Sequence, residues 1–138
     1  MRPTLPPDYR PSEDEDFMNP LQLEYFRQKL LNWRMELLAE STDTLLQLKE
    51  ESLSEPDVTD RASLETERGI VLRTRDRERK LISKIDAALL RIEDGSYGFC
   101  EETDEPISLR RLEARPIATL SLEAQERHER MERTHRDE

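Results

Sequence analysis

The sequence predicts an all-α fold whose main feature is a long antiparallel coiled-coil hairpin. Apolar residues recur at alternating spacings of three and four in two long stretches, and one short segment containing a proline separates the stretches. The composition agrees, since only 34% of the 138 residues are hydrophobic and 39% are charged. So low an apolar fraction favours an elongated helical protein over a compact α/β enzyme.

The first helix is expected to begin at Asn19 and Pro20. Asparagine is a good N-cap, and proline at the first helical position loses no hydrogen bond. Neither Gly nor Pro interrupts residues 21–54, so we expect a helix of about 30 residues. Its apolar stripe consists of Leu23, Phe26, Leu30, Trp33 and Leu37. Residues 1–16, which are rich in proline and acidic residues, have little to bury and are expected to form a disordered tail.

The break between the helices lies at residues 52–60, where Pro56 disfavours helix at the residue before it. Turn or N-cap residues follow it, namely Asp57, Thr59 and Asp60. Periodic sequence resumes at Leu64, and the second helix is expected to end at Gly95. Its apolar stripe consists of Val71, Ile82, Ile85, Leu89 and Ile92.

Charge is segregated along the hairpin. Between residues 40 and 67 acids outnumber bases nine to two, and between residues 73 and 91 bases outnumber acids seven to three. Within the basic segment, ion pairs of Asp76 with Arg79 or Lys80 are expected to support the helix. The net charge of −10 argues against sequence-independent DNA binding, which relies on clustered basic residues.

The sequence pattern changes after Gly95. Turn-rich sequence follows, one or two helical turns are expected between Pro106 and Pro116, and a very polar final helix is expected over residues 120–136. No apolar run approaches the roughly 20 residues of a membrane span, and the N-terminus lacks the apolar region of a signal peptide. One cysteine cannot form an internal disulfide, so the sequence predicts a cytoplasmic protein.

Two groups of charged residues are candidates for binding. Asp57 and Asp60, at the tip of the hairpin, can hold Mg²⁺, accept hydrogen bonds from a partner or cap the second helix, and capping is the commonest role. The basic residues can bind a phosphate or form a solvated, ion-paired helix face, and the second role is the more frequent. They are residues 73–84 with Arg110, Arg111 and Arg115.

Neither metal binding nor catalysis is favoured by the spacing of the reactive residues. Cys100 has no second thiol three residues later, and His128 and His135 lie two helical turns apart, whereas structural zinc sites use four soft ligands. The sequence contains no readable nucleophile–base pair and no Gly-rich phosphate loop. We therefore expect no enzyme activity.

Five segments together resemble the DksA/TraR family of bacterial transcription factors, and the likeness covers nearly all of the chain beyond the tail. They are Phe17-Met-Asn-Pro-Leu-Gln-Leu-Glu-Tyr-Phe-Arg27, Asp57-Val-Thr-Asp-Arg-Ala62, Arg73-Thr-Arg-Asp-Arg-Glu-Arg-Lys-Leu-Ile82, Gly98-Phe-Cys100 and Arg110-Arg-Leu-Glu-Ala-Arg-Pro116. The third and fifth segments are the most specific.

The resemblance implies a coiled-coil hairpin carried on a small globular domain. That domain would combine the N-terminal segment, the C-terminal helix and a degenerate zinc-finger-like knuckle, by which we mean the segment between Gly95 and the C-terminal helix. The expected divisions are a tail at residues 1–16, an N-terminal helical segment at 17–32, a hairpin at 33–94 with its tip near 54–62, and a knuckle with C-terminal helix at 95–138.

The resemblance also implies a monomeric regulator that binds RNA polymerase through the secondary channel without sequence-specific DNA contacts. With ppGpp it would repress ribosomal RNA promoters and activate some biosynthetic promoters. By position, the tip residues are Asp57, Asp60 and Ala62, and the interface with ppGpp and polymerase contains Arg77, Leu81, Lys84 and Arg115. A further basic position of that interface falls on the uncharged Gln125.

The largest departure from the family is at the knuckle. Zinc-bearing members have four cysteines there, and the positions in register are Cys100, Thr103, Ser121 and Ala124. The sequence therefore resembles a zinc-free branch, and apolar packing is expected to offset the missing metal. The candidate residues for this packing are Tyr97, Phe99, Ile107, Leu109, Leu112, Ile117, Leu120 and Leu122.

Two other functions remain as alternatives. A helical-hairpin adaptor would bind another protein through a coherent apolar face, yet the tip segment offers aspartates instead. A transcript-cleavage factor of the Gre type would share the hairpin and use tip carboxylates to hold a metal ion, but the specific DksA/TraR segments speak against it.

Overall fold

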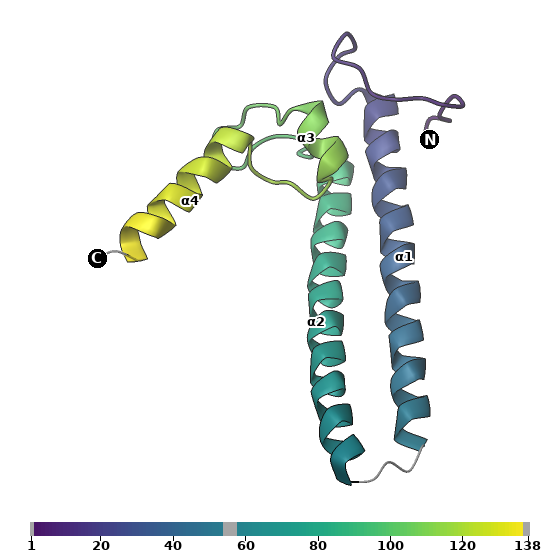
Figure 1. Ribbon diagram of the computed structural model, residues 1–138. Coiled ribbons are helices and arrows are strands. Elements are labelled where there is room, and N and C mark those ends of the chain that lie inside the picture. The colour runs from purple at the N-terminus through teal and green to yellow at the C-terminus, as the bar shows by residue number, and fades with distance from the viewer. Residues whose placement is uncertain (1, 54–57, 137–138) are drawn as a thin grey trace. The chain divides into compact units, whose positions relative to one another are not determined.

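The computed structural model of the chain describes residues 2–53 and 58–136, and the described part is helical throughout its regular structure (Figure 1). The helices are α1 (Pro20–Leu53), α2 (Val58–Asp94), α3 (Leu109–Ala114) and α4 (Leu122–Arg136). Within the described residues, β-type pairing is limited to one isolated antiparallel bridge between Phe99 and Pro106. The all-α prediction is confirmed. The chain forms two compact units, Leu31–Asp86 and Met1–Leu30 with Ala87–Glu138.

The expected start of α1 is confirmed, and that of α2 is corrected. The Asn19 side-chain oxygen accepts a hydrogen bond from the Gln22 amide at 3.0 Å, so Asn19 caps α1. The second helix begins at Val58, six residues before Leu64. Thr59 and Asp60 are thus helical, whereas Asp57 lies outside the described residues. Helix is favoured here because no Gly or Pro lies between Pro56 and Gly69.

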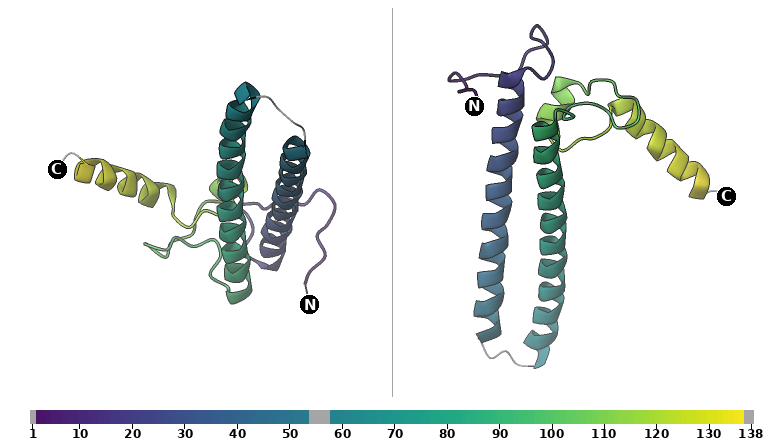
Figure 2. Two further views of the ribbon diagram at one scale, coloured as in Figure 1. Left: turned by 90° about the horizontal axis from the view of Figure 1, so that it is seen from below. Right: turned by 180° about the vertical axis from the view of Figure 1, so that it is seen from behind.

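In the unit Leu31–Asp86, α1 and α2 lie side by side and run in opposite directions (Figures 1 and 2). Leu37 and Ile85 are buried between them, and an ion pair joins Arg34 to Asp86 at 2.8 Å. The expected pairing of Asp76 with basic neighbours one turn away is confirmed. Its carboxylate lies 3.1 Å from Lys80 and 3.9 Å from Arg79.

The two helices of this unit bury few apolar side chains. Large apolar side chains are exposed along its length, at 68% for Met35, 54% for Leu46 and 55% for Leu72. A low apolar fraction in the sequence thus corresponds to a narrow contact between two helices rather than to a broad core.

The other unit contains the larger core. Buried apolar residues come from the first third of α1, the last residues of α2 and the segment that follows. They are Phe26, Leu30, Ala88, Tyr97, Cys100, Ile107, Leu109, Leu112, Ile117, Ala118 and Ala124. The Phe26 and Tyr97 rings lie 5.7 Å apart, and the Tyr97 hydroxyl donates to the Pro116 carbonyl at 2.8 Å. The buried Tyr97 therefore satisfies its polar end.

The expected helices after Gly95 are confirmed as α3 and α4, and each has a serine N-cap. The Ser108 hydroxyl accepts from the Arg111 amide at 3.2 Å, and the Ser121 hydroxyl accepts from the Ala124 amide at 3.2 Å. Outside its first turn, α4 is exposed along the residues whose side chains are described. Lys29 of α1 pairs with Glu113 of α3 at 2.9 Å, which ties these helices together within the unit.

Residues ahead of α1 make specific contacts. The Tyr9 hydroxyl donates to both carboxylate oxygens of Glu15 at 3.0 and 3.1 Å, and the Ser12 amide donates to the same carboxylate at 2.9 Å. The Gln22 side chain donates to the Ser12 carbonyl at 3.3 Å. These contacts do not test the expected disorder of residues 1–16, which stays a prediction.

The predicted apolar cluster is correct in its centre and wrong at its edge. Tyr97, Ile107, Leu109, Leu112 and Ile117 are buried as expected. Phe99 is 37% exposed and Leu122 is 54% exposed, so these two side chains do not belong to the core. Phe99 instead packs edge-on against Phe17 with ring centroids 5.4 Å apart. Small residues that the prediction omitted close the cluster, namely Cys100, Ala118 and Ala124.

None of the helices formed by residues 20–53 and 58–136 combines the length and the apolar character needed to cross a membrane.

Candidate functional site: the knuckle and the faces of α2

The knuckle is a tight backbone turn that doubles back on itself. The Cys100 amide donates to the Glu105 carbonyl at 2.8 Å, and the Ile107 amide donates to the Gly98 carbonyl at 2.7 Å. Gly98 has φ of +92°, and a Cβ there would lie 3.1 Å from the Met18 side chain. The positive φ therefore favours glycine at this position, and a Cβ there would also make a tight contact with the Met18 side chain.

A second segment lies beside this turn. The Glu101 amide donates to the Thr119 carbonyl at 2.9 Å, which brings the start of α4 next to Cys100. The sulfur of Cys100 accepts hydrogen bonds from the Thr103 hydroxyl and from the Ser121 amide. Ser121 in turn caps the Ala124 amide. The structure thus brings together the four positions that sequence analysis placed in register with zinc-binding cysteines.

The Cys100 thiol is held as an acceptor of hydrogen bonds. Burial by itself raises its pKa, but the Thr103 hydroxyl and the backbone amides of Ser121, Thr103 and Glu102 outweigh that effect and lower the pKa from 9.0 to about 6. The residue is 1% exposed. At neutral pH the side chain is therefore mostly a thiolate, and backbone dipoles stabilise its negative charge.

The donor set at the knuckle does not fit a structural zinc ion. The four positions supply one thiolate, two hydroxyls and a methyl group, whereas structural zinc takes four Cys or His ligands. One of these hydroxyls, that of Ser121, is already occupied by the Ala124 amide. Within residues 2–53 and 58–136, no group of three or more His, Cys, Asp or Glu side chains is arranged to hold a metal ion.

Three of the predicted interface residues share one face of α2. Arg77, Leu81 and Lys84 lie at i, i+4 and i+7, which places them one above another along the helix. Arg77 and Lys84 are exposed and Leu81 is half-buried. No ion pair joins either cation to another residue in the described part of the chain, so both charges face solvent.

The remaining predicted site residues belong elsewhere. Arg115 is exposed at the C-terminal end of α3, and the Gln125 side chain donates to Glu129 within α4 at 3.3 Å. Asp60 and Ala62 are in the first turns of α2, but their side chains lie outside the described residues, as does Asp57 altogether. The predicted roles of the tip residues stay predictions.

Sequence reasoning missed the part played by His128. It considered this residue only as a metal ligand, yet the imidazole Nε2 of His128 contacts the Glu102 carboxylate, which joins α4 to the knuckle. These residues are 26 positions apart, so no local pattern reveals the contact.

Known protein families match both the helical hairpin and the cysteine-poor knuckle. The family described as DnaK suppressor protein DksA, N-terminal domain, matches residues 22–92. The family described as prokaryotic dksA/traR C4-type zinc finger matches residues 95–130. These matches define the class as the DksA/TraR type. The chain belongs to the DksA family.

Individual relatives cover most of the chain. The RNA polymerase-binding transcription factor DksA of Caulobacter vibrioides is 68% identical over 131 residues, which span 95% of this chain and 92% of that protein. The protein of the same name from Escherichia coli K12 is 44% identical over 115 residues, spanning 83% and 76% of the two chains.

A solved structure, that of transcription factor DksA2 from Pseudomonas aeruginosa, is also similar. It has a TM-score of 0.80 at 45% identity and covers 85% of this chain and 90% of that chain.

Proposed function

We propose that this protein binds RNA polymerase and regulates transcription. The observation that carries the proposal is the similarity to proteins named RNA polymerase-binding transcription factor, which extends over nearly the whole chain at 68% identity. The similarity includes both the hairpin helices and the knuckle. A function that depends on the complete arrangement is therefore the one best supported.

We further propose that the hairpin enters the secondary channel and that ppGpp binds at the interface. The tip would act through Asp57 and Asp60, and their negative charge suits a channel that leads to basic residues and metal. The exposed cations Arg77 and Lys84 support a phosphate-binding role, because a guanidinium or ammonium pairs strongly with phosphate oxygens. Arg115 would complete this set.

The uncharged Gln125 gives the proposed ppGpp site one cation fewer than the family pattern. We therefore expect a weaker response to ppGpp than a basic residue at this position would give. The protein is further proposed to act as a cytoplasmic monomer without enzyme activity and without zinc. The hydrogen bonds at Cys100 and the caps at Ser121 support zinc independence, because they occupy the positions where metal ligands would lie.

Transcription in vitro from a ribosomal RNA promoter tests the role of the tip. The double variant Asp57→Asn with Asp60→Asn should lose repression while it keeps binding to polymerase, because the contacts along the helices remain. A matched control removes two charges elsewhere on α1, with Asp43→Asn and Glu50→Gln, and should repress normally. Full repression by the tip variant would contradict the mechanism, and lost binding by both variants would contradict the placement of the contacts.

Titration with ppGpp in the same assay tests the second site. Removing one charge-assisted phosphate contact with Arg77→Ala should raise the ppGpp concentration for half-maximal effect about tenfold or more, since such a bond contributes roughly 1.5–3 kcal/mol. Gln125→Lys should lower that concentration. Arg130→Ala, an exposed cation on α4, is the control and should leave the titration unchanged.

A further inference from the structure

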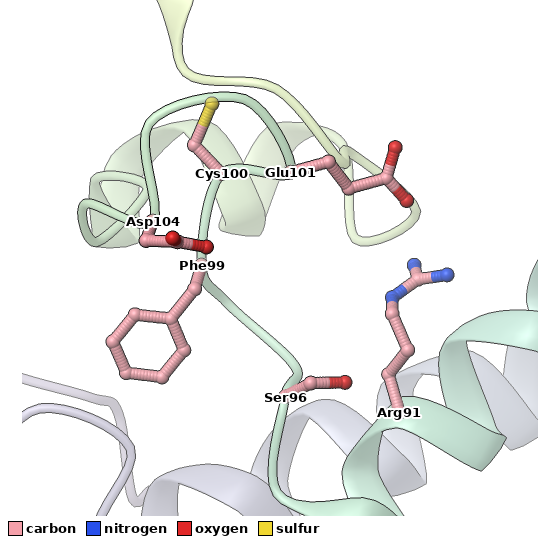
Figure 3. Close-up of a pocket in the computed structure, with 6 residues that line it drawn as sticks. All are labelled: Arg91, Ser96, Phe99, Cys100, Glu101 and Asp104. Atoms are coloured by element: carbon pink, nitrogen blue, oxygen red, sulfur yellow. The ribbon is translucent and has the colours of Figure 1, made fainter.

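A cavity of about 390 Å³ opens on the knuckle, on the side where α2 ends. Its walls are formed by Arg91, Ser96, Phe99, Cys100, Glu101 and Asp104, all of which belong to one unit. Figure 3 shows the Arg91 guanidinium and the Glu101 carboxylate on one side of this space, with Asp104 and the Phe99 ring on the other. The cavity thus has a cationic wall, two carboxylates, the Cys100 sulfur and an aromatic surface.

The Arg91 guanidinium makes no side-chain hydrogen bond or close ion pair within the described residues, although acids are close to it in the sequence. Its Nη2 atom is buried and makes no hydrogen bond to any described residue. Glu93 is paired with Arg2 at 3.0 Å. The Asp94 carboxylate accepts from the Ser96 hydroxyl at 2.6 Å and the Ser96 amide at 2.9 Å, and these bonds lower its pKa. The positive charge of Arg91 also lowers the pKa of Asp94, but neither neighbouring acid forms a hydrogen bond or a close ion pair with the Arg91 guanidinium in the described residues.

The carboxylates of the cavity are also unengaged. Neither Glu101 nor Asp104 makes a side-chain hydrogen bond or an ion pair with another residue of the described ranges. A buried donor without a partner loses its hydration without compensation, and such groups in native proteins call for an explanation. A ligand that accepts from Arg91 would satisfy its buried donor, and a cationic group on the same ligand could pair with the two exposed carboxylates.

We propose that this cavity binds a free α-amino acid with an apolar side chain. The ligand carboxylate would accept hydrogen bonds from Arg91, and its ammonium group would donate to Glu101 and Asp104. Its side chain would lie against the Phe99 ring, which is 37% exposed. The volume lies within the range of small-ligand sites. A simple dianion such as phosphate fits less well, because two carboxylates face the same space.

Binding would join the end of α2 to the loop around Cys100 through one bridging molecule. The bridge uses residues on both sides of the turn at Ser96 and Gly98, so it would restrain residues 96–104. The proposal is independent of polymerase binding, and its test uses the isolated full-length protein.

Titration calorimetry with three matched probes tests the assignment. L-leucine carries both charges, N-acetyl-L-leucine lacks the ammonium group, and L-leucinamide lacks the carboxylate. We expect leucine to bind and each analogue to bind at least tenfold more weakly. In parallel, nitrogen–proton correlation spectra should show leucine-dependent shifts confined to amides of residues 91–104.

Variants of the cavity locate the charges. Arg91→Gln should weaken leucine binding at least tenfold and leave the weak binding of leucinamide unchanged, whereas Arg91→Lys should retain part of the affinity for leucine. Asp104→Asn should weaken leucine more than N-acetyl-leucine. Arg127→Gln, which removes an exposed charge from α4, is the control and should bind as the unchanged protein does.

Three outcomes would overturn the proposal. They are no detectable binding of leucine at millimolar concentration, equal binding of leucine and leucinamide, and full affinity in Arg91→Gln. Circular dichroism of each variant establishes that the helices are intact, so a loss of binding can be assigned to the cavity.

Discussion

Replacing Cys100 with serine should remove a contribution to stability that depends on pH. The thiol pKa is about 6 in the folded protein and 9.0 when the group is unperturbed, as it is in the unfolded chain. A group with a lowered folded pKa stabilises the fold when it is ionised. The contribution is therefore complete above pH 9, decreases as the pH falls from 9 to 6, and is absent below about pH 5.

The magnitude follows from the two pKa values. At pH 7 the linkage relation gives about 1.4 kcal/mol in favour of the folded state. Relaxation and screening in the protein reduce such interactions, so we expect about 1 kcal/mol. The same relation gives nearly zero at pH 5. The difference between the protein and its Cys100→Ser variant should therefore grow by about 1 kcal/mol between pH 5 and pH 7.

Urea unfolding of both proteins at pH 5, 7 and 8.5, in the presence of a reductant, measures this difference. Carboxylates that titrate near pH 5 affect both proteins equally and cancel in the subtraction. The absorbance of the thiolate at 240 nm, followed against pH, reports the pKa of Cys100 directly. The reasoning is refuted if the stability difference is the same at pH 5 and pH 8.5, or if the absorbance titrates near pH 9.

Two further predictions concern the knuckle. Ile107 has no exposed surface, so Ile107→Ala should lower the free energy of unfolding by about 2–5 kcal/mol. Phe99 is partly exposed, so Phe99→Ala should lower it by about half as much. Thermal melting measures both losses, and equal losses would contradict this ranking. The triple variant Thr103→Cys, Ser121→Cys and Ala124→Cys should bind one equivalent of zinc, because these positions already lie together with Cys100. The protein is dialysed against a chelator and its metal content is then measured. If no zinc is found, the inferred geometry is wrong.

Helix positions could be predicted from sequence because their signals are local. The cap at Asn19, the absence of Gly and Pro through residues 21–54 and the stop at Gly95 each act within a few residues. The start of α2 was misjudged because the periodic apolar stripe begins at Leu64, whereas the helix itself extends back to Val58. Only Val58 and Ala62 are apolar between residues 58 and 63, which is too few to form a helical apolar pattern.

The burial of individual side chains was predicted less well. Phe99 and Leu122 are as apolar as the residues that are buried, but the bridge at Phe99 and the first turn of α4 direct them outward. Ala118 and Ala124, in contrast, are buried although their side chains are small. Hydrophobicity alone does not distinguish these cases, because burial depends on which way the backbone turns each Cα–Cβ bond.

The sequence by itself determined the helical class, the length of the hairpin, the segregation of charge and the loss of three of the four thiols at the knuckle. Only the tertiary structure decided what the remaining thiol does. Amides and a hydroxyl from positions 102, 103 and 121 converge on Cys100, and the buried Nη2 of Arg91 is left without a hydrogen bond while Glu93 pairs with Arg2 and Asp94 accepts from Ser96. Both results depend on groups distant in sequence or on competition between hydrogen bonds, which a linear pattern does not encode.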